Sequence, residues 1–157
     1  MKHTIAVMVE NKFGVLARVA GLFSARGYNI ASLAVSETLD PQISAMTIVV
    51  HAEDDKILEQ INKQLNKLID VITVIDFTKK EHVERELVLA KVNYKPASKG
   101  KIEKLLKKYL GKIIKISKNT AVIEAVGEQE QVKQLLDGLK TFGIKELIRT
   151  GKIAIAV

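Results

Sequence analysis

The sequence contains no cysteine and no tryptophan, and aromatic residues make up only 4% of its 157 residues. The lack of cysteine excludes disulfide bonds, thiolate metal sites and catalysis by a thiol. The low aromatic content leaves no row of stacking side chains, which single-stranded nucleic acids need on a protein sheet. We therefore expect neither a disulfide-stabilised fold nor a nucleic acid partner.

Long hydrophobic runs are also missing. No stretch of about 18 apolar residues occurs, so we expect no transmembrane helix and no membrane partner. The apolar run in MKHTIAVMVENK is too short and too soon followed by charge for a signal peptide, which favours a cytoplasmic protein. With 47% hydrophobic and 27% charged residues, the chain has a globular composition, and its length suits one ordinary domain or two small ones.

The net charge of +7 is unevenly distributed along the chain. Residues 1–78 hold seven Lys and Arg against nine Asp and Glu, which leaves 18 basic and nine acidic residues for the second half. This asymmetry indicates two domains with different partners. A heat-adapted source, in which Lys and Glu are enriched generally, explains the abundance of lysine equally well.

The first half of the chain shows the order strand, helix, strand, strand, helix, strand. The strands are expected at HTIAVMVE, YNIASLAVSET, SAMTIVVHA and VITVIDFT, and the helices at GVLARVAGLFSARG and DDKILEQINKQLNKL. Both helices carry an apolar stripe at helical spacing. The stripes consist of Val15, Leu16, Val19, Leu22 and Phe23 in the first helix, and of Ile57, Leu58, Ile61, Leu65 and Leu68 in the second.

The second half repeats this order without obvious sequence identity. HVERELVLAKVNY, KIIKIS, TAVIEAV and IKELIRTGKIAIAV are predicted strands, and KGKIEKLLKKYL and EQEQVKQLLDGLKTFG are predicted helices. Ser98 is the expected N-cap of the third helix. The chain is thus predicted to be an α+β protein of two tandem ferredoxin-like βαββαβ units, one over residues 4–78 and the other over residues 79–157.

Groups for catalysis or metal binding are few. The pair Asp54 and Asp55 is interpreted as charge at a helix N-terminus, where acidic residues are favourable. His3 and His51 could be neighbours on adjacent strands, but without a carboxylate in the same motif they make a poor zinc site. We expect them, like His82, to be ordinary surface residues. KPASKGKIEK lacks the spacing of a phosphate-binding loop and is interpreted as a solvated basic helix. No residue is predicted to be catalytic, and no metal is predicted.

One short segment remains without an obvious structural purpose, namely the turn between the first strand and the first helix. The first turn of a helix exposes unpaired N–H groups that bind carboxylates, and Gly14 allows a ligand to approach the backbone. Asn11 offers a donor and an acceptor, which suits an amino acid zwitterion. The alternative is an Asx-type turn at Asn11, with Gly14 present only for its φ angle. The residues by themselves leave both interpretations open.

The segment ENKFGVLARVAGLFSARGYNIASL resembles the start of an ACT domain, a small ferredoxin-like module that binds amino acids as allosteric effectors. More narrowly, it resembles the small, regulatory subunits of acetolactate synthase (acetohydroxyacid synthase). DPQISAMTIVV is also similar to that family, except that Ala45 stands where Arg is usual. The resemblance is strong from about residue 4 to 92 and weaker beyond. The matching residues are Asn11, Gly14, Leu16, Arg18, Val19, Gly21, Leu22, Phe23, Arg26, Gly27, Tyr28, Asn29 and Ile30.

The resemblance implies a function and a partner. The partner is a large catalytic subunit, which joins pyruvate to a second 2-keto acid in branched-chain amino acid biosynthesis. Thiamine diphosphate, Mg and FAD belong to that subunit, and no cofactor is expected in this chain. The small subunit is implied to be a non-catalytic part of a transferase that raises its activity and confers feedback inhibition by valine, with isoleucine or leucine as alternative effectors. Its second domain is the expected contact with the catalytic subunit.

The predicted effector site combines residues from two chains. Asn11, Gly14, Val15 and Leu16 come from one chain, and Asn29 and Ile30 from its partner. In a ferredoxin-like unit of strand order 4-1-3-2, the second strand is an edge that is free to pair with a copy of itself. Antiparallel pairing about a two-fold axis brings Asn29 of one chain toward Asn11 of the other. We therefore expect a homodimer with two equivalent interfacial sites.

A protein of another class stays open as an alternative. An amino acid sensor coupled to DNA binding also uses ACT domains, but it requires a helix-turn-helix or a ribbon arm beside the sensor. Neither half of the sequence shows one.

Overall fold

The computed structural model describes residues 1–157, which divide into two compact units. The first unit comprises Met1–Val83 together with Ile153–Val157, and the second comprises Glu84–Lys152. The predicted division at residues 78 and 79 differs from these units in two respects. The linker and the first residues of the fifth strand belong to the first unit, and so do the last five residues of the chain, where the Val157 N–H donates to Glu81 O at 3.3 Å.

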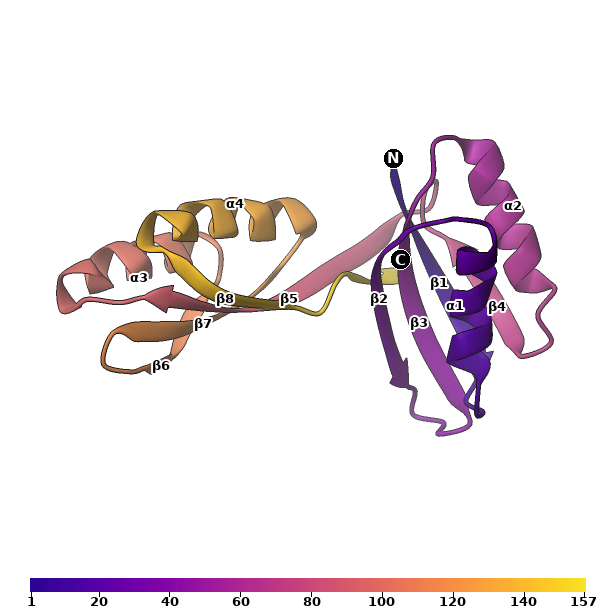
Figure 1. The fold of residues 1–157 in the computed structure, drawn as a ribbon, viewed down its shortest axis with the longest axis horizontal. Coiled ribbons are helices and arrows are strands. Elements are labelled where there is room, and N and C mark those ends of the chain that lie inside the picture. Colours follow the sequence, from indigo (N-terminus) through magenta and orange to yellow (C-terminus); the bar gives the residue numbers. More distant parts are fainter. The chain divides into compact units, whose positions relative to one another are not determined.

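The first unit is a four-stranded antiparallel sheet with two helices on one face (Figure 1). The strand order β2-β3-β1-β4 is the one predicted for a ferredoxin-like unit. Since β1 and β2 both run antiparallel to β3, they are parallel to each other. The elements are β1 (Lys2–Glu10), α1 (Val15–Ala25), β2 (Ile30–Glu37), β3 (Ile43–His51), α2 (Asp55–Asn66) and β4 (Val71–Asp76).

The core of the first unit lies between the sheet and its helices. Along β1, Ile5, Val7 and Val9 face the helices and are at most 1% exposed, which follows from the two-residue period of a strand. In α1 the predicted stripe is correct except at Leu16, which is 45% exposed, whereas its neighbour Val15 is buried. Leu16 lies at the edge of the stripe, beside the first turn of the helix, and is therefore available for contact from outside.

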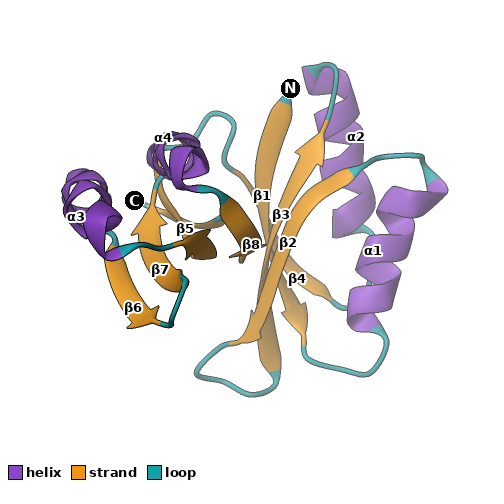
Figure 2. Cartoon of the chain, turned by 60° about the vertical axis from the view of Figure 1, so that its left-hand side comes forward, coloured by secondary structure: helices purple, strands orange, loops and turns teal.

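The second unit repeats the architecture, with a sheet of order β6-β7-β5-β8 and both helices on one face (Figure 2). Arg149 on β8 and Glu86 on β5 join two strands of this sheet, with nitrogen–oxygen distances of 2.7 and 2.9 Å. These hydrogen bonds raise the pKa of the Arg149 guanidinium above its usual value. Its elements are β5 (His82–Asn93), α3 (Lys99–Lys108), β6 (Lys112–Ile116), β7 (Thr120–Gly127), α4 (Gln129–Leu139) and β8 (Ile144–Arg149). The last strand, β9 (Ile153–Ala156), belongs to the first unit.

Two local predictions in the second half need correction. Ser98 is the N-cap residue of α3, as predicted, but its side chain makes no capping hydrogen bond; its hydroxyl bonds back to Lys95, because a 3-10 turn at Pro96–Ser98 precedes the helix. The last predicted strand is interrupted between β8 and β9, where Gly151 has φ of +75°. A left-handed glycine turns the chain out of the extended conformation, and the short β9 then returns to the first unit.

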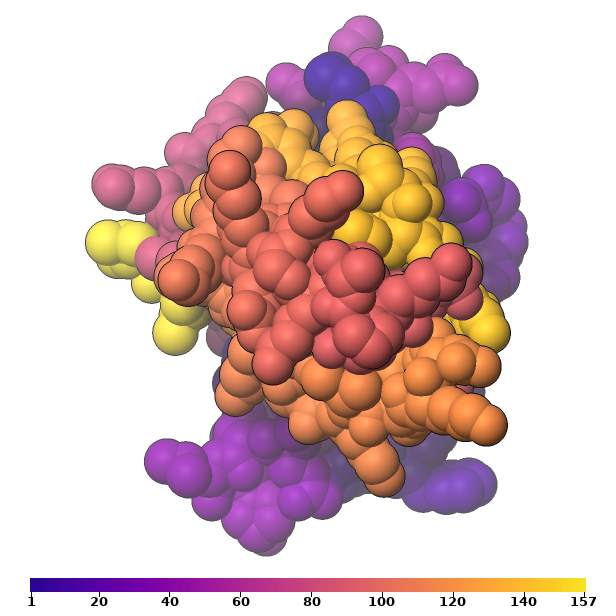
Figure 3. All heavy atoms as spheres, turned by 90° about the vertical axis from the view of Figure 1, so that its left-hand side faces the viewer, coloured from indigo at the N-terminus to yellow at the C-terminus, as the bar shows by residue number.

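Helix α3 carries much of the positive charge of the second unit on its exposed side. Figure 3 looks onto this unit and shows side chains of the salmon-coloured helix α3 projecting outward. The five lysines of α3 are all exposed, namely Lys99, Lys101, Lys104, Lys107 and Lys108. The predicted solvated basic helix is therefore confirmed.

Candidate functional site

The turn before α1 ends in an uncapped helix N-terminus. Gly14 is the N-cap residue and adopts the left-handed conformation, with φ of 80° and ψ of −5°. The Val15 N–H donates to Lys12 O at 3.3 Å, but no side chain caps the helix and no acidic residue lies in its first turn. The N–H groups of Leu16 and Ala17 are left without an acceptor within the chain. Such a pair of donors, at the positive end of the helix dipole, suits a carboxylate.

Asn11 is fixed by the loop between β2 and β3. Its backbone N–H donates to Gln42 O at 2.7 Å, and its side-chain Nδ2 donates to Glu37 Oε1 and Pro41 O at 3.1 and 2.9 Å. Both amide hydrogens are thus used inside the chain, and Asn11 Oδ1 remains as an acceptor. The side chain does not form the Asx turn considered from the sequence, although Gly14 does have the positive φ angle of that alternative.

The predicted site residues do not all lie together in one chain. Asn11 adjoins the start of β3, whereas the Asn29 carbonyl accepts from the His51 N–H at the end of β3. Asn29 and Ile30 are therefore at the opposite end of the sheet, as the topology predicted. Near Asn11, Leu16 is exposed, but the Val15 side chain is only 3% exposed and packs into the core. Val15 can contribute to a site only through its backbone.

Two charged residues to which the sequence analysis assigned no role form an ion pair beside this turn. Arg18, in the second turn of α1, donates from Nε and Nη2 to Asp70 Oδ2 at 3.0 and 2.7 Å. Asp70 lies between α2 and β4 and is 8% exposed. A Cβ added at Gly14 would lie 3.3 Å from Arg18 Nη1. Arg18 belongs to the motif that carried the family resemblance, but Asp70 lies 52 residues away, so only the structure could pair them.

Ala45, which replaces the usual Arg, lies in the middle of the sheet. It is paired with Met8 of β1 and Ser36 of β2, and it is exposed. The short side chain leaves this position without a charge.

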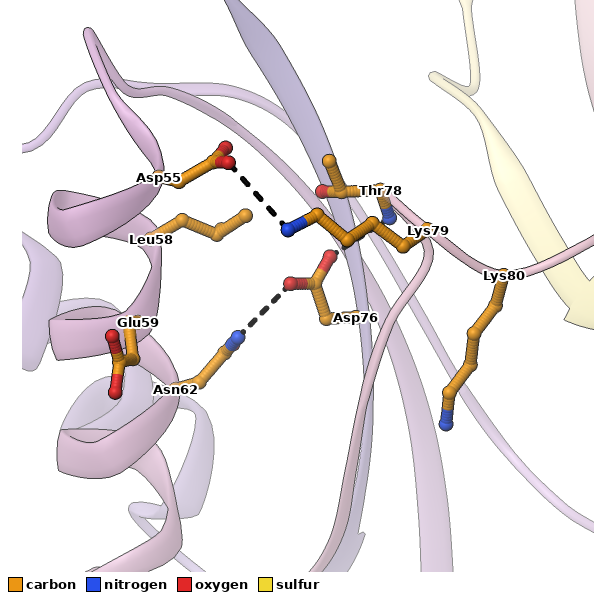
Figure 4. Close-up of a pocket in the computed structure, with 8 residues that line it drawn as sticks. All are labelled: Asp55, Leu58, Glu59, Asn62, Asp76, Thr78, Lys79 and Lys80. Atoms are coloured by element: carbon orange, nitrogen blue, oxygen red, sulfur yellow. Dashed lines mark hydrogen bonds and ion pairs between the residues drawn. The ribbon is translucent and has the colours of Figure 1, made fainter.

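A separate cavity of about 390 Å³ lies between α2 and the segment that follows β4 (Figure 4). In it, Asn62 donates to Asp76 at 3.2 Å, and Lys79 reaches across to Asp55 at 3.6 Å. Buried Asn62 Oδ1 has no partner. None of the predicted effector residues lines this cavity, so it is distinct from the turn before α1.

The histidine prediction needs one correction. His3 is not a surface residue but is 5% exposed, and its Nδ1 lies 3.2 Å from Thr78 Oγ1. His3 is paired with Val50 and His51 with Lys2, so the two histidines point to opposite faces of the sheet. No group of three or more His, Cys, Asp or Glu in the chain is arranged to hold a metal ion. None of its helices has the length and apolarity needed to cross a membrane.

Comparison with known protein families identifies the class of protein to which each half of the chain belongs. Residues 5–73 match the family described as the AHAS small subunit-like ACT domain, so the first unit is an ACT domain. Residues 85–157 match the family described as the small subunit of acetolactate synthase.

Relatives that match over nearly the whole chain narrow the assignment. A probable acetolactate synthase small subunit of Archaeoglobus fulgidus is 51% identical over 98% of this chain and 96% of its own. The acetolactate synthase small subunit of Bacillus subtilis is 40% identical, over 99% and 91%. The crystal structure of the Thermotoga maritima small subunit superposes with a TM-score of 0.89 at 37% identity, covering 100% of this chain and 98% of that one. This chain belongs to the family of acetolactate synthase small subunits.

Proposed function

We propose that this chain is the regulatory subunit of an acetolactate synthase, which activates the catalytic subunit and makes it sensitive to valine. The observation that carries the proposal is the uncapped N-terminus of α1 behind a left-handed Gly14, in a chain that belongs to the small subunit family. This turn has the donors for the carboxylate of an amino acid and, in Asn11 Oδ1, an acceptor for its ammonium group.

The aliphatic side chain of the effector needs an apolar surface next to these polar groups. Leu16 supplies one, because it lies two residues after Gly14 and is 45% exposed. A branched-chain amino acid would cover part of this exposed area, and burial of apolar surface contributes about 25 cal/mol per Å². Valine is the effector we propose, with isoleucine and leucine as the alternatives to be compared.

The second half of the effector site comes from a partner chain in this proposal. β2 is an edge strand, so its outer hydrogen-bonding groups are free from Ile30 to Glu37. Antiparallel pairing of two such strands places the start of one β2 beside the end of the other. The end of β2 is linked to Asn11 by the bond to Glu37, so Asn29 and Ile30 of the second chain would approach Asn11. The homodimer would then hold two equivalent sites.

The second unit is the proposed contact with the catalytic subunit. It carries the excess of positive charge, exposed on α3, and its few aromatic residues give it no platform for nucleic acid. The chemistry would take place in the catalytic subunit, which holds thiamine diphosphate, Mg and FAD in this proposal, within the cytoplasm. The DNA-binding alternative has no support, since every α-helix belongs to one of the two ferredoxin-like units.

Calorimetric titration of the purified chain with valine, isoleucine and leucine tests the effector assignment. Alanine is the control ligand, because it has the same ammonium and carboxylate groups but lacks the branched side chain. We expect saturable binding of a branched-chain amino acid, with one site per chain, and much weaker binding of alanine. Absence of binding for all three branched-chain amino acids would contradict the proposed function.

A further inference from the structure

The Arg18 guanidinium is held in place by a buried carboxylate. Two of its three nitrogens, Nε and Nη2, donate to the same oxygen of Asp70. The Asp70 side chain is only 11% exposed, and the Asp70 carbonyl accepts from the Glu10 N–H at 2.9 Å. Asp70 is therefore anchored to the end of β1, next to the effector turn. Arg18 is fixed by this anchor rather than moving freely in solvent.

The third nitrogen, Nη1, is directed at the effector turn. A Cβ placed on Gly14 would lie 3.3 Å from Nη1, so the guanidinium adjoins the first residue of that helix terminus. The Arg18 side chain is 52% exposed, which leaves it accessible to a ligand. Lys12, the other cation of the turn, is instead paired with Glu10 at 2.6 Å. Arg18 is thus the cation positioned to face a negative group at the turn.

We propose that Arg18 Nη1 binds the carboxylate of the amino acid effector, together with the free N–H groups of Leu16 and Ala17, and that Asp70 is the residue that positions it. This inference rests on the proposed function, because it concerns the same site. A planar guanidinium can bond two groups in fixed directions, which a single ammonium cannot do. Arg18 would therefore make the site specific for a free carboxylate over an uncharged amide.

The decisive variant is Arg18→Lys, compared by calorimetry at pH 7 with the wild type, using valine and valinamide as ligands. A lysine can still pair with Asp70, but it cannot also reach the turn. Valinamide keeps the ammonium group and the branched side chain while it lacks the carboxylate. A hydrogen bond between charged groups at a half-exposed position is worth about a factor of ten in affinity. We expect the preference for valine over valinamide to fall about tenfold in Arg18→Lys.

Two further variants separate binding from structural support. Asp70→Asn keeps the shape and loses the charge that fixes the guanidinium, so we expect a smaller fall in the same preference. Lys12→Gln is the matched control, since Lys12 faces Glu10 and should leave the preference unchanged. Thermal unfolding of each variant records any loss of stability, which by itself would not change the ratio between the two ligands.

The outcomes distinguish this inference from the proposed function. If the wild type binds no branched-chain amino acid, the proposed effector site itself is wrong. If the wild type prefers valine to valinamide and Arg18→Lys keeps the same preference, then Arg18 serves only to tie α1 to Asp70 and the inference is overturned. A fall in the preference for Arg18→Lys and not for Lys12→Gln supports it.

Discussion

At the scale of single residues, Gly14 controls access to the helix terminus. Its φ of 80° lies in the left-handed region, which glycine adopts without cost and aspartate adopts more readily than most other residues. The turn is not in the core, so a substitution at this position changes the site more than the fold.

We predict that Gly14→Asp folds but loses its response to valine. The new side chain would start 3.3 Å from Arg18 Nη1, where its carboxylate can take the place of the effector carboxylate and repel an incoming anion. Lost hydrogen bonds and repulsion together cost about 2–4 kcal/mol, or about 30- to 1,000-fold in affinity. Activation should persist, because we assign it to another surface.

The measurement is the activity of the reconstituted holoenzyme at increasing valine concentration, for wild type and Gly14→Asp. Asn11→Ala and Asn29→Ala should show weaker forms of the same change. Equal inhibition of wild type and Gly14→Asp at the same valine concentration would place the effector site elsewhere.

At the scale of secondary structure elements, β2 determines the proposed dimer. It is the edge of the first sheet, and Val35 on it is 40% exposed. Apolar exposure combined with free backbone groups favours pairing with another strand, whereas a lysine on an edge strand prevents it.

We predict that Val35→Lys produces a monomer, because two copies of the new charge would meet near the two-fold axis. Leu39→Lys is the matched control, since Leu39 is fully exposed in the loop after β2 and lies outside the strand. Sedimentation at micromolar concentration with valine present should show a monomer for the first variant and a dimer for the second. A monomeric wild type, or a dimeric Val35→Lys, would refute pairing through β2.

The elements also show how far the sequence predicts this molecule. The apolar, β-branched run in β1 and the apolar stripe in α2 predicted both elements. The stripe also predicted which face of α2 is buried, because that face must pack against the core. The strand order followed from the βαββαβ order alone. The N-cap position of α3 was predicted correctly, but the Ser98 hydroxyl bonds to the preceding turn and not to the helix, and sequence does not decide between these two partners.

Long-range pairs were beyond sequence reasoning. The residues of the turn at Asn11 and Gly14 left an effector site and a plain turn equally open, and the family resemblance favoured the effector site. The use of both Asn11 amide hydrogens by the β2–β3 loop depends on tertiary structure, and so does the pairing of Arg18 with Asp70. The burial of His3 likewise depends on tertiary contacts, such as the one between its Nδ1 and Thr78 Oγ1 after β4.

At the scale of the whole molecule, the uneven charge separates the roles of the two units. The first 78 residues carry a small negative balance, and the excess of lysine lies in the remainder. Exposed charges on a binding surface raise the association rate and make binding sensitive to salt.

We predict that replacing Lys101, Lys104 and Lys107 with Gln raises the concentration of this chain needed for half-maximal activation of the catalytic subunit, with a larger effect at low salt. The control replaces three exposed lysines of the first unit, Lys2, Lys56 and Lys67, and removes the same charge. An equal effect of the two triple variants at every salt concentration would show that net charge, and not the surface of α3, is responsible.

The most direct test of the regulatory role is reconstitution of the catalytic subunit with this chain. Activity is measured while this chain is added, and then while valine is added to the saturated complex. The account predicts that activity rises to a plateau as this chain is added and falls when valine is added to the saturated complex. The catalytic subunit alone should respond neither to valine nor to bovine serum albumin, which is added as a protein control. An activity that is unchanged by this chain, or a complex as insensitive to valine as the catalytic subunit alone, would contradict it.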